Sequence, residues 1–241
     1  MMTLQWIDLR CPVCESTFES MAALASDDDG QHYIDPTAPA TNAAALPFLL
    51  HVCRRCGYTG SIADFGEGVE ISQELRERVL AELAPKLGTS VRIPWLALTV
   101  PGSDKYDGAA RIAEWRGDSA RHVAQLWIRA AWCCLEEDDV EAERYYARFA
   151  ARWFANALDL YGEIDDDERA TMAYRLGELW LRIGDTTQAS GWFERVAGEI
   201  VDPESQRTLL EAENQLAQGH TTAATALVAA YKAVGGTWPV R

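Results

Sequence analysis

Two short cysteine motifs near the N-terminus constrain this chain more than any other feature of its sequence. They are CPVC and CRRC, and each places two cysteines three positions apart. Such a pair can curl so that both sulfurs reach one ion about 2.3 Å away, and two pairs complete a tetrahedron. Gly57 follows the second pair, where the backbone often needs a positive φ. We therefore predict one structural zinc ion held by four thiolates, which are Cys11, Cys14, Cys53 and Cys56.

Other chemistries fit these cysteines less well. A redox dithiol of the thioredoxin kind begins a helix after a strand, and neither motif is followed by a helical pattern. A catalytic zinc keeps one coordination position open, whereas four thiolates leave none. His51 is an alternative ligand, but one residue separates it from the second pair. A four-thiolate structural site is therefore the prediction that we carry forward.

The composition bounds the class of protein. Of 241 residues, 48% are hydrophobic and nine are Trp, so the chain can bury a sizeable core. The formal net charge of -15 argues against nucleic acid and against an anionic membrane, since both are bound through Lys and Arg. The longest strongly apolar run, residues 43–50, is too short to span a bilayer. Because the N-terminus also lacks a secretory-signal pattern, we expect a cytoplasmic protein with reduced thiols.

Residues 1–68 have the pattern of a small zinc-ribbon-like β module. Apolar residues before CPVC and Phe18 after it predict two strands joined by the first motif. The sequence DDDG at residues 27–30 is a turn signal. A buried strand is predicted over residues 48–52, and a returning segment over residues 58–65.

Residues 69–104 are predicted to form a helix and an extended connector. The helix is indicated by apolar residues at four-residue steps, which are Ile71, Leu75, Val79 and Leu83. Gly88 is expected to end it. The connector follows over residues 89–102 and contains two prolines.

Residues 105–241 are predicted to be helical, with short turns between successive helices. The pair Asp118-Ser119 offers a cap for the first of these helices. That helix has an apolar stripe formed by Val123, Trp127, Ala131 and Leu135. Further helices are predicted over residues 140–161, 165–183, 188–199, 204–218 and 221–234.

One helical pair follows the tetratricopeptide pattern. Leu176 and Gly177 stand at its Leu-Gly positions, and Ala189 and Phe193 follow at the expected distances. The small residues allow two helices to approach, with Gly177 at the contact. A weaker copy extends over residues 212–228. The predicted fold class is α+β, mainly α: a small N-terminal zinc-ribbon-like β module followed by a tetratricopeptide-like antiparallel helical repeat domain.

Several longer stretches occur in a recognisable order. CPVC is followed by CRRCGY at residues 53–58, then by LWIRAAW, and then by YRLGELWLRIGDTTQASGWF at residues 174–193. In this order they resemble the bacterial domain-of-unknown-function family 2225. The resemblance implies paired cysteine knuckles with a bound metal, followed by tetratricopeptide-like helices. It implies no activity, because that family is uncharacterised.

The remaining chemistry-bearing residues favour structural roles. Cys133 and Cys134 lie in an apolar helical stretch and are expected to be buried. The acidic run at residues 165–168 suits a solvated helix start. Arg54 and Arg55 are expected at a solvated knuckle tip. The sequence contains no phosphate-cradling Gly loop and no H-E-x-x-H motif.

We expect a non-catalytic protein–protein interaction module whose helical groove holds a protein or peptide segment. The acidic charge suits a basic segment. Tyr174, Glu178 and Leu181 are predicted to line the groove, with the first two exposed. Two alternatives remain open: an enzyme with its site in the cleft between the zinc module and the helical domain, and a zinc-ribbon factor associated with nucleic acid.

Overall fold

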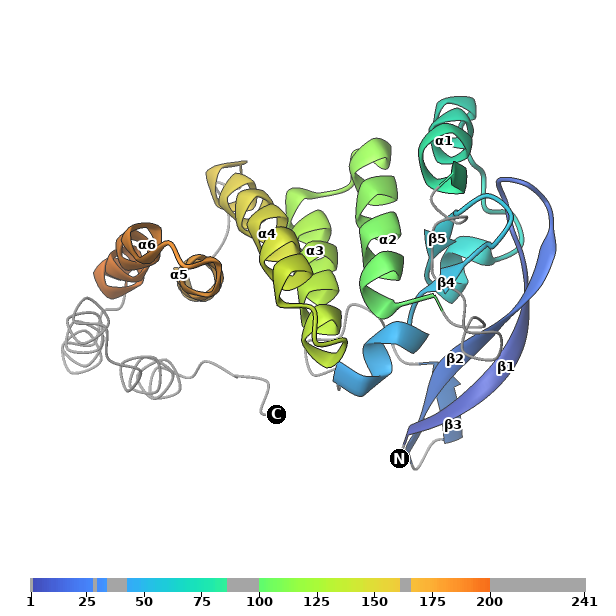
Figure 1. Ribbon diagram of the computed structural model, residues 1–241, viewed down its shortest axis with the longest axis horizontal. Helices are drawn as coiled ribbons and strands as arrows, with labels where there is room; N and C mark the ends of the chain where they lie inside the picture. The colour runs from blue at the N-terminus through green and yellow to red at the C-terminus, as the bar shows by residue number, and fades with distance from the viewer. Residues whose placement is uncertain (1, 28–29, 34–42, 86–99, 161–165, 200–241) are drawn as a thin grey trace. The chain divides into compact units, whose positions relative to one another are not determined.

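The chain is mainly helical, with a small antiparallel strand module at its N-terminus (Figure 1). The computed structural model describes residues 2–27, 30–33, 43–85, 100–160 and 166–199. Two compact units are present, Met1–Tyr146 and Ala147–Arg241. The predicted boundaries after residues 68 and 104 both fall within the first unit.

The first cysteine motif joins two long strands, as predicted. Strand β1 (Met2–Arg10) pairs antiparallel with β2 (Thr17–Asp27), so that Arg10 lies opposite Thr17 and residues 11–16 form the connection. Strand β3 (Gly30–Tyr33) pairs with the far end of β2 and completes a sheet of order β1-β2-β3.

The second cysteine motif joins two very short strands. Strand β4 (His51–Val52) pairs antiparallel with β5 (Thr59–Gly60), and residues 53–58 form the connection. The prediction of a strand over residues 48–52 is too long, because a 3-10 helix, η1 (Ala43–Phe48), occupies its start. A second 3-10 turn, η2 (Ile62–Phe65), follows β5.

A helix packs directly on this module. It consists of α1 (Gln73–Arg78) and a π-helical turn, η3 (Val79–Leu83). The predicted stripe is confirmed, since Leu75, Val79 and Leu83 are buried in the module's core. The helix end predicted at Gly88 and most of the predicted connector lie outside the described residues.

The first unit also contains two long helices side by side, α2 (Gly102–Arg116) and α3 (Ala120–Glu136) (Figure 1). The predicted cap of α3 is confirmed, because the backbone N–H of His122 donates to Ser119 Oγ at 3.3 Å. Helix α4 (Val140–Leu160) follows and crosses the boundary between the units. Within the first unit, the rings of Trp127 and Tyr146 stack with centroids 5.8 Å apart.

The second unit contains the helical pair α5 (Asp166–Ile183) and α6 (Thr186–Glu199). The break between them falls at Gly184, whose φ of 93° favours glycine. Asp185 then caps α6 by accepting from the N–H of Gln188 at 3.0 Å. The helices predicted over residues 204–218 and 221–234 lie outside the described residues, so the tetratricopeptide-like repeat itself stays a prediction.

Gly177 lies where α5 meets α6, as the sequence predicts. A Cβ atom built at this position would be 2.3 Å from the ring of Phe193. That ring is 1% exposed, so it has little room to move away. Gly191 on α6 provides the opposite environment, since a Cβ there would have nothing within 4 Å.

These two glycines give a matched test of the helical contact. Gly177→Ala should lower the free energy of unfolding by roughly 1–3 kcal/mol, because the new methyl group overpacks the Phe193 ring. Gly191→Ala should raise it by up to about 1 kcal/mol, because alanine favours an exposed helix. Chemical denaturation of both variants measures the difference. A Gly177→Ala protein as stable as the wild type would contradict the contact.

Candidate metal centre

The two cysteine motifs form closely similar turns. In the first, the N–H of Glu15 donates to the carbonyl of Cys11 at 2.9 Å. In the second, the N–H of Gly57 donates to the carbonyl of Cys53 at 2.8 Å. A further pair of bonds closes each turn, from Cys11 N–H to Ser16 O and from Cys53 N–H to Tyr58 O, both at 2.9 Å. The same backbone arrangement therefore presents both pairs of sulfurs.

The residue after each motif has a left-handed backbone. Gly57 has a φ of 80°, which confirms the prediction for that position. Glu15 has a φ of 61° in the corresponding place, although a side chain makes this conformation unfavourable. The similarity of the two turns explains why Glu15 adopts it, but nothing in the residue type indicates this in the sequence.

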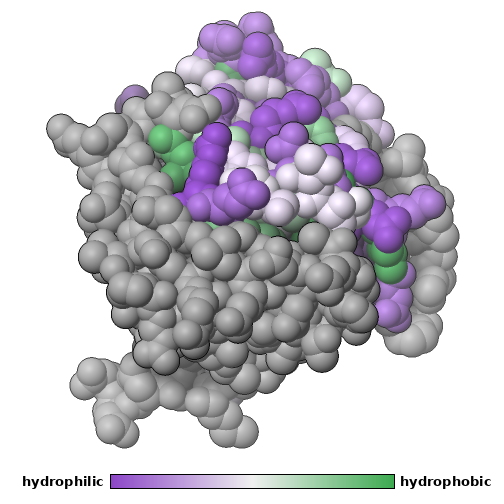
Figure 2. Space-filling model, turned by 90° about the vertical axis from the view of Figure 1, so that its left-hand side faces the viewer, coloured by the Kyte–Doolittle hydropathy of each residue, from purple (hydrophilic) through white to green (hydrophobic). Residues whose placement is uncertain are grey.

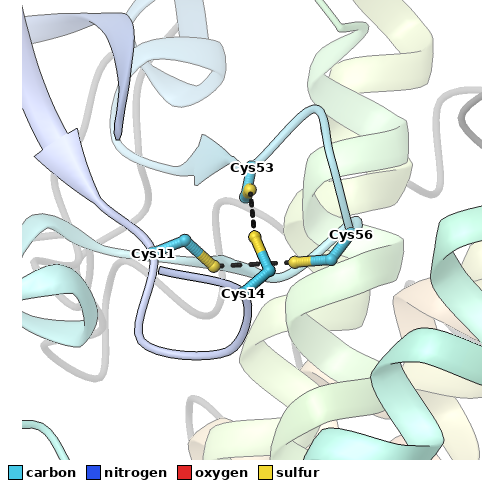
Figure 3. Close-up of side chains that lie close together, drawn as sticks. All are labelled: Cys11, Cys14, Cys53 and Cys56. Carbon is cyan, nitrogen blue, oxygen red and sulfur yellow. Dashed lines mark hydrogen bonds between the residues drawn. The ribbon is translucent and has the colours of Figure 1, made fainter. Parts of the chain in front are cut away.

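The four predicted ligands converge (Figure 3). The sulfur of Cys11 lies 3.5 Å from that of Cys56, and the sulfur of Cys14 lies 3.5 Å from that of Cys53. All four sulfurs lie within 4.8 Å of one another. A tetrahedral ion with bonds of about 2.3 Å to sulfur requires sulfurs about 3.8 Å apart. The cluster therefore has the right size for one metal ion.

The cluster lies inside the core of the N-terminal module. Cys11, Cys53 and Cys56 are 0% exposed, and Cys14 is half-buried. Buried side chains from β1, both turns, η2, the α1–η3 helix and α2 surround it; they are Leu9, Val13, Tyr58, Phe65, Leu75, Val79, Leu83 and Ile112. A metal bound here would hold that core together from its centre.

The thiols influence one another's protonation strongly. Hydrogen bonds from Cys11 and Cys56 lower the pKa of Cys53. The same contact with Cys53, together with burial, raises the pKa of Cys11 to about 12. Hydrogen bonds with both neighbours also raise the pKa of Cys56. A bound metal would supply positive charge that favours ionisation of these coupled thiols.

Two polar side chains support the first turn. The guanidinium of Arg76, on α1, donates to the carbonyls of Val13 and, at 3.2 Å, of Pro12. Ser16 Oγ lies 3.0 Å from the Cys14 sulfur. The sequence gives no signal for the contact of Arg76, because it joins residues more than 60 positions apart.

The structure separates the remaining histidine and cysteine candidates from the cluster. His51 is buried and its Nδ1 lies 2.8 Å from Ser20 Oγ, so it is held away from the four sulfurs. Burial lowers the pKa of His51 to about 4, which keeps its ring neutral. Cys133 and Cys134 are buried, as predicted. Arg54 and Arg55 are exposed on the second turn.

The predicted groove residues are placed differently from the expectation. Tyr174 is 1% exposed and its ring centroid is 5.7 Å from that of Phe193, so the prediction of an exposed side chain is wrong. The face of α5 that carries Tyr174 and Gly177 is turned toward α6, because the Phe193 ring fills the space beside Gly177. Glu178 and Leu181 are half-buried, and burial raises the pKa of Glu178 to about 7.

The first unit contains a pocket between the predicted zinc module and the predicted helical domain, where the enzyme alternative expected a cleft. It lies between the turn after β5 and helices α2 and α3, and Ser61, Asp64 and His122 are among its lining residues. Ser61 Oγ donates to Asp64 at 2.7 Å. The serine is thus bound to a carboxylate and is not paired with the histidine as a catalytic nucleophile would be.

These features define a mainly helical protein built on an N-terminal four-cysteine module. The chain belongs to the family described as "Uncharacterized protein conserved in bacteria (DUF2225)", whose model matches residues 7–218. This confirms the resemblance stated from the motifs. No curated protein and no solved structure matches the chain.

The strained turn provides a test of the site's backbone. Glu15→Gly should raise the free energy of unfolding by roughly 0.5–1 kcal/mol, because glycine adopts a positive φ without steric cost. Glu15→Gln keeps the side chain and should leave stability nearly unchanged. Gly57→Ala should be destabilising, since its Cβ would lie 2.7 Å from the Leu83 Cβ. Denaturation of the metal-loaded variants measures all three, and a less stable Glu15→Gly protein would contradict the expected strain.

Proposed function

We propose that the four cysteines bind one zinc ion and that this ion is structural. The observation that supports this most directly is the convergence of four sulfurs, three of them 0% exposed. Thiolate ligands in a tetrahedral arrangement favour zinc over the harder cations, which prefer oxygen. Four protein ligands leave no position for a substrate or a water molecule, so the ion would supply folding energy and no catalysis.

We further propose that the helical part is an interaction surface for a protein or peptide segment. The pair α5 and α6 supports this, because Gly177 lies against the buried ring of Phe193, which is a close helical contact of the kind that a tetratricopeptide-like repeat would use. Glu178 and Leu181 would contact the segment. Tyr174, in this proposal, supports the surface from below by packing on Phe193.

The hydrophilic surface and the negative net charge are consistent with a partner that binds through polar contacts. On the face shown in Figure 2, the described surface is mostly hydrophilic and its hydrophobic areas are small. The net charge of -15 would favour a basic segment and disfavour nucleic acid. Within the described part of the chain, no helix combines the length and hydrophobicity needed to cross a membrane. We propose a cytoplasmic location, where thiols stay reduced and available to metal.

Metal content tests the zinc proposal. The purified reduced protein should carry about one zinc per chain, as measured by elemental analysis. Cys53→Ser should release it and loosen the N-terminal module, because structural zinc supplies on the order of 10–16 kcal/mol in small finger peptides. Cys134→Ala is the matched control, since it removes a buried thiol outside the cluster and should leave zinc content unchanged. Metal-free wild-type protein with a native fold would contradict the proposal.

Variants on α5 test the interaction surface. Glu178→Lys combined with Leu181→Ser should lower the free energy of unfolding by roughly 1–3 kcal/mol, because both side chains are half-buried. Capture is therefore compared at a temperature at which every variant is folded. The double variant should lose proteins that the wild type captures from the native cell. Glu194→Lys, an exposed charge reversal on α6, is the control and should keep them. Identical capture by all three proteins would contradict the proposed surface.

A further inference from the structure

Helix α4 carries a concentration of positive charge in an otherwise acidic chain (Figure 1). Its residues 144–158 contain three arginines, Arg144, Arg148 and Arg152, and no Asp or Glu. This part of the helix therefore has a net charge of +3 within a chain of net charge -15. All three arginine side chains are exposed. A local positive potential on an acidic protein favours a ligand of negative charge.

The three arginines form one stripe along the helix. They follow one another at four-residue intervals, and side chains at this interval are neighbours on a helix surface. Successive arginines are about 6 Å apart along the axis, because each residue rises about 1.5 Å. The opposite side of α4 contains buried side chains, among them Tyr146, Ala150 and Phe154. The arginine stripe is thus the solvent-facing side of an amphipathic helix.

The stripe has no counter-charge of its own. Within the part of the chain that the structure describes, no ion pair engages any of these three guanidinium groups. The guanidinium carbon of Arg152 instead lies 5.6 Å from the centroid of the Phe149 ring. Like charges four residues apart repel each other and destabilise a helix. The stripe therefore lowers the stability of α4 as long as no anion neutralises it.

Aromatic side chains form a second stripe beside the arginines. Tyr145, Phe149 and Trp153 each follow one of the arginines by one position, so they recur at the same interval. Tyr145 is 44% exposed, and Phe149 and Trp153 are half-buried. Arg and aromatic residues are the types most enriched where protein partners bind. The exposed face of α4 thus combines charge with adjoining apolar area.

We propose that this face of α4 binds an acidic helical segment of a partner protein. The carboxylates of the segment pair with the three arginines, and its apolar side chains contact Tyr145 and Phe149. A helix with Glu at every fourth position repeats its carboxylates at the same interval of about 6 Å. Guanidinium groups also bind carboxylates through two parallel hydrogen bonds, which strengthens each pair. The surface lies on a different helix from Glu178 and Leu181, and the proposal depends neither on them nor on the metal.

The number of arginines favours a short acidic segment over a nucleic acid. Salt-sensitive binding to nucleic acid uses roughly six to ten phosphate contacts, whereas this stripe offers three guanidinium groups. A long polyanion would also meet the remaining surface of a chain with net charge -15 and be repelled by it. A short segment meets only the positive face of α4.

Fluorescence polarisation of the full-length, metal-loaded protein tests the proposal with labelled peptides. The probe repeats Leu-Glu-Ala-Ala, so that Glu recurs at every fourth position. It should bind saturably, and the Kd should rise several-fold as NaCl increases from about 0.05 M to about 0.5 M, because salt screens exposed charges. The same peptide with Gln in place of Glu should bind at least tenfold more weakly. No saturable binding of the acidic peptide, equal binding of the Gln peptide, or tighter binding of an oligouridine of similar length would overturn the proposal.

Two charge reversals locate the binding on the protein. Arg148→Glu interrupts the stripe at its centre and should raise the Kd for the acidic peptide at least tenfold. Its melting temperature should equal or exceed that of the wild type, because the new carboxylate lies four residues from both Arg144 and Arg152. Arg195→Glu makes the same change in net charge at an exposed position of α6, and should change the Kd less than twofold.

The two measurements separate binding from folding. An unchanged Kd in Arg148→Glu, or an equal loss of binding in Arg195→Glu, would show that the stripe is not the site. A melting temperature of Arg148→Glu clearly below that of the wild type would show that the arginine has a structural partner, and would likewise overturn the proposal.

Discussion

The N-terminal module depends on the burial of four thiols at its centre. In an ordinary small domain, aliphatic side chains would occupy this position, but here the two turns deliver cysteines to it. Two sheets of only three and two strands cannot enclose a large core. Helix α1 and Ile112 of α2 close the space around the sulfurs. The four cysteines are thus the common contact of the two turns, of the helix α1–η3 and of α2.

The sequence was most informative where one residue type has one physical role. Paired cysteines, the left-handed glycine at position 57, the cap at Ser119 and the small residue at Gly177 each do what their chemistry requires. It was least informative where the surroundings decide. Helix α2 buries Ser103 and Lys105 in its first turn, so its pattern is not that of an ordinary amphipathic helix.

The predicted groove residues and the pocket also depend on tertiary surroundings that the sequence pattern does not reveal. The rotation of α5 about its axis depends on which of its faces receives the Phe193 ring from α6. The tetratricopeptide pattern predicted an exposed Tyr174, whereas its side chain is buried. The pocket gathers Asp64, Arg116 and Arg129 from segments far apart in the chain. No motif joins them, since tertiary packing alone brings the three side chains together.

The separation of the two turns along the chain has a consequence for biosynthesis. Cys14 and Cys53 are 39 positions apart, and α1 follows them. At roughly 5–20 residues per second, a ribosome exposes the first pair of thiols about 2–8 seconds before the second. During that interval no complete binding site exists. The nascent module must therefore stay open until its second turn emerges, and its first thiols depend on the reducing power of their surroundings.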